Sequence, residues 1–248
     1  PPFVRRQLTG RRRIDMLELC STLIFYLASN YICGTFISEQ ERNELHQHFL
    51  DIEDYLALAR VFLPFNSAVL QKRERMRKRI LAILQAALER RLSSAQTEED
   101  CLSTIIERHR DAAGLFGERQ REEAAISVMG LIMGAHINTA ISLAATLYDL
   151  LGQPIRLATV KHEADNILAG RPFQLDALLE MRTMFRCINE SIRIRGNGAI
   201  FRKALKPVSL GEWIIPQDGI LVSMMGLINQ RVDVYPDPAT YNPERYHN

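Results

Sequence analysis

The chain has 248 residues, of which 47% are hydrophobic and 24% charged, so it can bury a substantial core and is not a disordered protein. A formal net charge of +2 is too small to indicate a nucleic-acid partner. The four cysteines lack the spacing of a zinc site, so neither a metal cluster nor a disulfide framework is expected. Because the sequence starts with Pro1 and not with Met, it fits a piece of a longer protein better than a complete product.

Apolar residues at helical spacing predict a first helix over residues 14–33. Asp15 suits the start of this helix, and Gly34 suits its end. A second helix is expected from residue 39 to about residue 58, because a charged first turn is followed by an apolar face.

The basic run at residues 71–79 resembles a nuclear-localisation signal when it is taken alone. Apolar residues nevertheless recur every three or four positions through this run and beyond it. The run is therefore interpreted as the solvated face of a long amphipathic helix that ends near Arg91. A polar linker at 93–100 and a short helix through Ile105 and Ile106 are expected next.

Residues 124–148 contain no Asp, Glu, Lys or Arg, which predicts a helix that is buried on all sides. Two interpretations compete: a membrane span, which needs roughly 20 apolar residues, or the central helix of a large core. We favour the core helix because polar groups within a bilayer are costly. A cluster of small and polar residues at the midpoint of the stretch would suit the approach of a flat ligand: Gly134, Ala135, His136, Asn138 and Thr139.

After Pro154 the pattern predicts a charged helix to about residue 169 and an amphipathic pair between residues 175 and 195. Short segments bounded by turn residues follow, at 199–205, 212–216 and 219–225, and these predict strands. Pro216, Asp218 and Gly219 predict a hairpin turn between the last two. The remaining tail is Pro-rich and irregular.

Glu190 and Arg193 lie three positions apart, on one face of a predicted helix. About fifty residues later comes the sequence Pro243-Glu244-Arg245-Tyr246. A carboxylate between two guanidinium groups can accept bidentate hydrogen bonds from both, and removing one partner of such a buried set costs roughly 3 to 5 kcal/mol.

An apolar helix with a small and polar notch, then E-x-x-R, then a hairpin, then P-E-R-[FY], resembles the cytochrome P450 superfamily. Residues 12–36 and 62–80 look most like the sterol 14-demethylase group and its relatives. The resemblance implies a mainly α fold with a small β region, incomplete at both ends. It also implies that residues 1–248 form one partial domain, with a helical region at 1–195 and a β region with the P-E-R loop at 196–248.

The resemblance further implies haem (iron protoporphyrin IX) as the cofactor and assigns roles to individual residues. Glu190 and Arg193 match E-x-x-R, and Arg245 matches the arginine that binds this pair. Arg202 looks like the arginine that pairs with a haem propionate. The segment from Leu131 to Thr139 would lie over the distal face of the haem, with Gly134 and Ala135 against the cofactor, while Leu131, Asn197 and Ile200 would line the substrate pocket.

The catalytic notch departs from the family's A-G-x-[DE]-T-T pattern. In one register Asn138 takes the place of the threonine, as in the relatives that include bile-acid hydroxylases and prostacyclin synthase. In the other, His136 takes the place of the acid, as in sterol demethylases. His136, Asn138, Thr139 or an ordered water could each deliver protons, and the alternative for His136 is a core histidine with satisfied hydrogen bonds.

A haem-thiolate enzyme also needs a cysteine on the iron, in a glycine-rich segment beyond the P-E-R motif. None of Cys20, Cys33, Cys101 and Cys187 has that setting, and Cys187 lies one turn before Glu190, where packing is its expected role. No metal ligand is therefore expected from this chain, which should be inactive alone.

The function implied by the resemblance is a monooxygenase that oxidises a hydrophobic steroid, terpenoid or lipid-like substrate. It would use O2 and electrons from NADPH-cytochrome P450 reductase or another donor, at the endoplasmic reticulum membrane, with no nucleic-acid partner. A haem isomerase of the same fold, or a truncated non-catalytic relative that acts as a binding protein, are the alternatives.

Overall fold

The computed structural model describes residue 9 and residues 13–56, 67–95, 99–170, 174–196 and 198–247, except the side chains of 53–56 and 67–69. The chain divides into two compact units, Pro1–Ile141 and Ser142–Asn248. Each unit has a hydrophobic cluster of its own. The predicted class, mainly α with a small β region, is confirmed.

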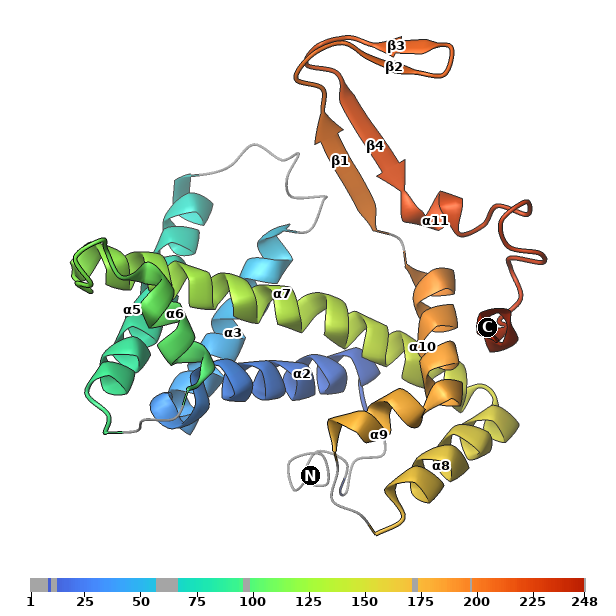
Figure 1. The fold of residues 1–248 in the computed structure, drawn as a ribbon, viewed down its shortest axis with the longest axis horizontal. Helices are drawn as coiled ribbons and strands as arrows, with labels where there is room; N and C mark the ends of the chain where they lie inside the picture. The colour runs from blue at the N-terminus through green and yellow to red at the C-terminus, as the bar shows by residue number, and fades with distance from the viewer. Residues whose placement is uncertain are drawn as a thin grey trace. The chain divides into compact units, whose positions relative to one another are not determined.

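The first unit is helical, and its helix boundaries follow local sequence features (Figure 1). Asp15 caps the first helix by accepting the Glu18 N–H at 2.9 Å, and Gly34, at φ 55°, ends it. Asp100 and Ser103 form a reciprocal capping box at the start of another helix. The elements are α2 (Met16–Cys33), η1 (Gly34–Phe36), α3 (Glu39–Leu56), α5 (Ser67–Leu92), α6 (Cys101–His109) and α7 (Glu118–Leu151), whose last ten residues belong to the second unit.

Helices α2, α3, α5, α6 and α7 bury one shared cluster of apolar side chains. Phe25 of α2, Phe49 of α3 and Leu84 of α5 are fully buried in it, as is Val128 of α7. The basic run at 71–79 lies in the first half of α5, where most of its charged side chains are exposed. The prediction of a solvated helix face is therefore confirmed.

Two segments, Met16–Phe36 and Glu118–Leu151, are long and apolar enough to cross a membrane. In this structure, 39% of the most apolar 18-residue stretch of the first segment is buried, and 33% of the most apolar 18-residue stretch of the second segment is buried. Both segments contribute side chains to the same cluster, among them Phe25, Ile32 and Ile132. The faces of α2 and α7 that carry these side chains therefore pack as core helices do.

The second unit combines helices with four short strands. Leu150 of α7, Val160 of α8 and Cys187 of α10 form its buried cluster, together with the partly buried Leu157 and Met184. Pro154, at the first position of α8, suits a helix start because its missing N–H would have no helical partner. The remaining elements are α8 (Pro154–Leu168), α9 (Leu175–Glu180), α10 (Arg182–Arg195), β1 (Ala199–Lys203), β2 (Val208–Leu210), β3 (Trp213–Ile215), β4 (Ile220–Met224), α11 (Met225–Ile228) and η2 (Pro243–Tyr246).

The strands form two antiparallel pairs, β1 with β4 and β2 with β3, and the second pair extends beyond the ends of the first (Figure 1). The predicted hairpin between β3 and β4 is wrong. Gly211, at φ 58°, makes a two-residue turn that pairs β3 with β2, a strand that we did not predict. The turn at Pro216–Gly219 instead returns the chain to β1, where Asp218 N–H donates to the Ala204 carbonyl at 2.8 Å.

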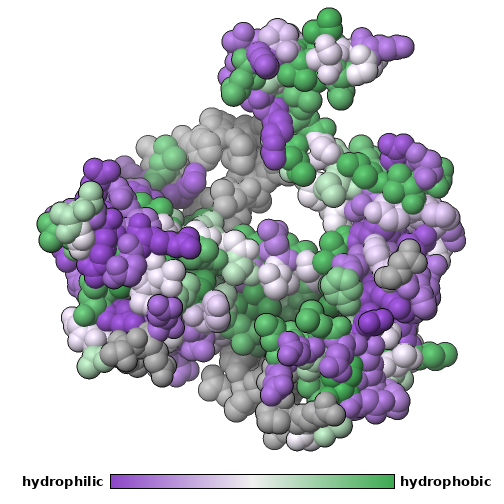
Figure 2. Space-filling view, in the orientation of Figure 1, coloured by the Kyte–Doolittle hydropathy of each residue, from purple (hydrophilic) through white to green (hydrophobic). Residues whose placement is uncertain are grey.

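Both faces of these strand pairs are mostly exposed. Figure 2 shows hydrophobic residues at the surface of this region, at the top of the view. Trp213, Ile214 and Ile220 are among the exposed residues of the strands. Since no buried face selects the pairing, the turns at Gly211 and Asp218 set the strand register.

Candidate functional site

Glu190 and Arg193 are neighbours on one face of α10, one helical turn apart. Both are buried, with exposed fractions of 0% and 3%. Arg193 Nε donates to Glu190 Oε2 at 2.8 Å, and Arg193 Nη2 donates to Oε1 at 2.9 Å. The pair is therefore bidentate, which is the strongest arrangement available to an arginine and a carboxylate.

Residues around η2 complete the cluster around Glu190. Arg245 Nε donates to Glu190 Oε1 at 3.1 Å, and the backbone N–H of Asn242 donates to the same oxygen at 2.8 Å. Arg245 also donates to the carbonyls of Pro236, Asp237 and Thr240, which fixes its own position. The structure thus brings Glu190, Arg193 and Arg245 together; we call this set the Glu190 clamp.

Two further residues that we did not predict support Arg193, and a third supports α10 nearby. Arg193 Nη1 donates to the Asn229 carbonyl at 2.8 Å, while the Asn229 side-chain amide donates to the Arg193 carbonyl at 2.9 Å. The Arg193 guanidinium lies 5.0 Å from the centre of the Tyr235 ring. Tyr241 OH donates to the Cys187 carbonyl at 3.1 Å and ties the loop before η2 to α10. No sequence motif indicates these contacts, because most of them use backbone atoms.

The Glu190 clamp makes the free energy of unfolding depend on pH. Burial favours the neutral form of Glu190, but hydrogen bonds from Arg193, from the Asn242 N–H and from Arg245 outweigh it and hold the pKa of Glu190 below its usual 4.5. A carboxyl whose pKa is lower in the folded state stabilises the fold above its unfolded pKa and loses that contribution as the pH falls through the folded value. We expect the urea midpoint to fall below about pH 4.5 less steeply in Glu190→Gln than in the unaltered protein. Equal slopes would contradict this.

Neighbouring ion pairs tie α10 to its surroundings in the second unit. Glu244 of η2 accepts from Arg156 of α8 at 3.1 Å and from Arg186 of α10 at 3.5 Å. The carboxylate of Asp149, in the last turn of α7, accepts from Arg195 Nε at 3.0 Å. Charged groups therefore link α7 and η2 directly to α10, and they link α8 to it through Glu244.

Cys187 lies in the buried cluster of the second unit. Burial raises the pKa of its thiol, so the thiolate form is disfavoured. This environment suits a packing residue and not a metal ligand. Among the described residues, no group of three or more His, Cys, Asp and Glu side chains could hold a metal ion.

The notch residues of α7 lie on two opposite faces of the helix. Leu131, Gly134, Ala135 and Asn138 are exposed and lie along one stripe, because Gly134 and Ala135 are each three or four positions from both Leu131 and Asn138. Thr139 is exposed beside them. We call this stripe, with Thr139, the open face of α7.

His136 does not lie on the open face, because about 100° of rotation per residue turns its side chain toward the core. It is fully buried, with Nε2 at 2.9 Å from Ser21 Oγ and 3.0 Å from the Ser21 carbonyl oxygen. Its ring meets that of Phe25 edge-on, with 5.4 Å between the ring centres. The structure therefore brings Asn138 and Thr139 together and separates them from His136.

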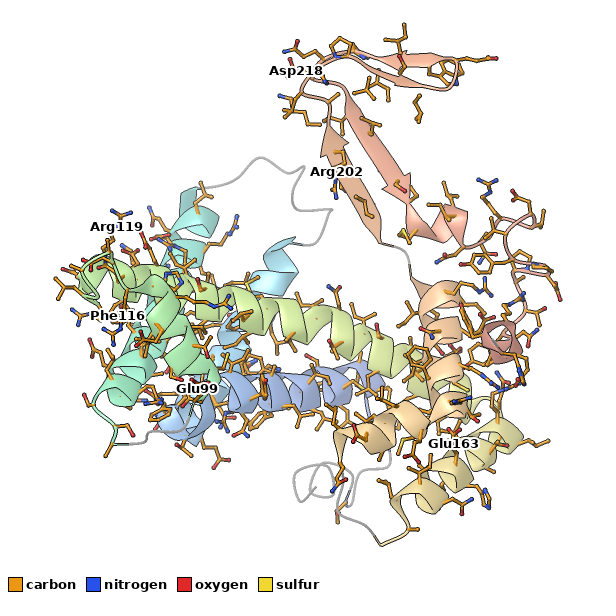
Figure 3. The ribbon with its side chains drawn as sticks, in the orientation of Figure 1. Glu99, Phe116, Arg119, Glu163, Arg202 and Asp218 are labelled. Carbon is orange, nitrogen blue, oxygen red and sulfur yellow. The ribbon has the colours of Figure 1, made fainter. Side chains whose placement is uncertain are left out.

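Arg202 projects from the middle of β1, where its exposed guanidinium donates to the Phe201 carbonyl at 2.8 Å (Figure 3). Ile200, two residues before Arg202 in the same strand, is 44% exposed. Asn197, the third residue predicted to line a substrate pocket with Leu131 and Ile200, lies outside the described residues.

Comparisons with known proteins agree on one family. The family model for cytochrome P450 matches residues 11–248. The sterol 14-demethylase of Arabidopsis thaliana is 24% identical over 248 residues, which cover 94% of this chain and 49% of that protein. The lanosterol 14-alpha demethylase of Homo sapiens is 25% identical over 240 residues, covering 94% of this chain and 46% of that protein.

Solved structures share the fold. A cyanobacterial cytochrome P450 with bound retinoic acid aligns with a TM-score of 0.81 at 20% identity, over 99% of this chain and 55% of that one. The heme domain of another cytochrome P450 aligns with a TM-score of 0.79 at 15% identity, over 99% and 54%. The chain spans about half the length of the curated relatives it matches.

Proposed function

The chain belongs to the cytochrome P450 family, and we propose that its protein is a monooxygenase that oxidises a hydrophobic steroid, terpenoid or lipid-like substrate. Haem is the cofactor of this family. The proposed reaction uses O2 and electrons from NADPH-cytochrome P450 reductase or another donor. The observation that carries the proposal is the buried Glu190 clamp, in which both arginines of the E-x-x-R and P-E-R motifs bind one carboxylate.

Two features of the chain fit haem. The open face of α7 presents small and apolar residues without a charged side chain, as a flat macrocycle requires. Among the described residues, the Arg202 guanidinium has one hydrogen-bond acceptor, the Phe201 carbonyl, so it retains N–H donors for a propionate carboxylate. Bound haem with a cysteine thiolate on its iron supplies the chemistry of O–O cleavage.

We propose that the residues of the open face have two different roles. Leu131, Gly134 and Ala135 would exclude water from the face that they cover. Asn138 and Thr139 are the only exposed residues of α7 between 131 and 141 with a hydrogen-bonding side chain, so they would hold a proton donor or a water near the reacting oxygen. His136, which is bonded to Ser21 in the core, is the weaker candidate for this role.

The wider setting of the protein is also a proposal. We propose that residues 1–248 belong to one domain, with a helical region at 1–195 and a β region with the P-E-R loop at 196–248. By the resemblance to the sterol 14-demethylase group, the proposed location is the endoplasmic reticulum membrane, and no nucleic-acid partner is proposed.

The proposal is tested by the absorption spectrum of the full-length protein. We expect its reduced carbon monoxide complex to show the Soret band of a thiolate-bound haem, because this band reports a cysteine ligand on the iron. Arg202→Ala should lower haem retention under dialysis, whereas Lys206→Ala, a matched loss of one exposed positive charge nearby, should leave it unchanged. A complex without the thiolate-type band would overturn the assignment.

A haem isomerase of the same fold is the second candidate. It is favoured by the absence of any titratable side chain on the open face of α7 over the described residues 131–141. An isomerase rearranges an oxygen-rich substrate and consumes no electrons. Product analysis with and without an electron donor separates the two functions, since only the monooxygenase requires the donor.

A further inference from the structure

Helix α10, which carries Glu190 and Arg193, does not cap its own first turn. The side chain of the N-cap residue, Met181, makes no capping hydrogen bond, and the first turn contains no acidic residue. The first N–H groups of a helix lack partners within the helix, and they attract negative charge. Another part of the chain must therefore satisfy them.

Glu163, from α8, supplies this cap (Figure 3). Its Oε1 accepts the N–H of Thr183 at 2.8 Å, and its Oε2 accepts the N–H of Met184 at 3.0 Å. These are the second and third residues of α10, whose N–H groups a normal N-cap side chain would bind. Burial favours the neutral form of Glu163, but these two N–H groups, together with the Thr183 side chain and the charge of Arg186, outweigh it and lower its pKa, so the carboxylate is the bound form.

Helix α8 also packs against the first half of α10. Val160 and Leu157 of α8 pack with Met184 and Cys187 of α10 in the buried cluster. At the other side, Arg156 of α8 binds Glu244 of η2, one residue before the arginine that reaches Glu190. Helix α8 therefore contacts both the start of α10, through Glu163, and η2, through Arg156. A shift of α8 would move both parts of the Glu190 clamp.

We infer that Glu163 is a positioning residue for the Glu190 clamp: by capping α10 from α8, it fixes the helix that presents Glu190 and Arg193 to η2. The inference deepens the proposed function, because the clamp belongs to the motifs on which that proposal rests. A purely local cap would stabilise only the first turn of α10. A positioning residue also affects the far end of the helix.

Hydrogen exchange of three backbone amides separates these two roles in the full-length protein. Thr183 and Met184 report the cap, and Asn242 reports the clamp because its N–H donates to Glu190. In Glu163→Ala we expect exchange at Thr183 and Met184 to rise roughly fivefold to tenfold, the size of a lost helix cap. We expect exchange at Asn242 to rise as well, by about threefold or more.

Two comparisons make the result specific. Asp165→Ala removes an exposed carboxylate from the same helix and should change none of the three amides. Glu163→Gln keeps one acceptor oxygen and should be intermediate at all three. The amides of Ile80 and Leu84, which are fully buried in α5, serve as the reference for global unfolding, so each change is expressed relative to them.

A rise at Thr183 and Met184 with no change at Asn242 would overturn the inference and leave Glu163 a local cap. Unchanged exchange at Thr183 and Met184 would overturn it too, since the hydrogen bonds would not protect these amides. Because exchange does not depend on turnover, either failure leaves the proposed monooxygenase function standing. A missing thiolate-type Soret band would in turn leave the exchange result intact.

Discussion

Replacing Arg193 with alanine is expected to lower the free energy of unfolding by about 3 to 5 kcal/mol. The side chains of Arg193 and Glu190 are 2% and 0% exposed, so the change leaves a carboxylate in the protein interior without its bidentate partner. Arg245 and the Asn242 N–H remain, but both bind only Oε1. Urea unfolding followed by circular dichroism measures the loss.

The matched control is Arg231→Ala, which removes another arginine from an ion pair of the second unit. Arg231 and Asp233 are 59% and 60% exposed, and exposed pairs of this kind contribute roughly 0 to 1 kcal/mol. The double variant Glu190→Leu, Arg193→Met should lose less stability than Arg193→Ala, because it leaves no carboxylate buried without its partner. If Arg193→Ala cost no more than Arg231→Ala, the clamp would not be the buried cluster described here.

Much of the clamp could be predicted from the sequence, because part of it is local. A three-residue step places Glu190 and Arg193 on one face of any helix, whatever surrounds it. Arg245 is fifty-five positions away from Glu190, and only the resemblance to a family connected the two. The Asn242 N–H and the Asn229 carbonyl are groups that every residue type provides, so no pattern could identify them.

The helix boundaries were also predictable, since the groups that set them are adjacent in sequence. Asp15 and Gly34 mark the ends of α2 through their own side chain and backbone conformation. The cap of α10 shows the opposite case. Glu163 is twenty positions before Thr183, and nothing near Met181 indicates that a residue of α8 will bind the helix start.

The predicted strand pairing was wrong for a related reason. The segments 213–215 and 220–224 are both apolar and are separated by good turn residues, which is the usual pattern of a hairpin. Gly211 provides a tighter turn before them, and it pairs 213–215 with 208–210 instead. Since neither face of these strands is buried, the hydrophobic pattern could not decide between the two pairings.

The orientation of His136 could not be predicted because α7 is apolar on nearly every face. A helix of this kind gives no periodicity that distinguishes the core side from the open side. The choice is made by packing against α2, where Ser21 offers two oxygen atoms to the imidazole and Phe25 offers a ring. The orientation of His136 is therefore set by tertiary packing, which the sequence pattern of α7 does not encode.

The packing of α2 on α7 predicts a second large loss of stability, on replacement of Phe25. Phe25 is fully buried, stacks on His46 with 4.7 Å between ring centres and meets Phe49 at 5.5 Å. Its ring also packs edge-on against His136, on the core side of α7. Phe25→Ala is expected to lower the free energy of unfolding by about 3 to 5 kcal/mol, through lost burial and the cavity that remains.

Leu27→Ala is the matched control, because Leu27 lies on the same helix and is 57% exposed. Its loss should change the free energy of unfolding by roughly 0.5 kcal/mol or less. Urea unfolding of the two variants measures the difference, and the chemical shifts of the His136 ring report whether it keeps its bond to Ser21. If Phe25→Ala were as mild as Leu27→Ala, α2 would not pack on α7 through this ring. The assignment of Asn138 and Thr139, and not His136, to the open face would then lose its physical basis.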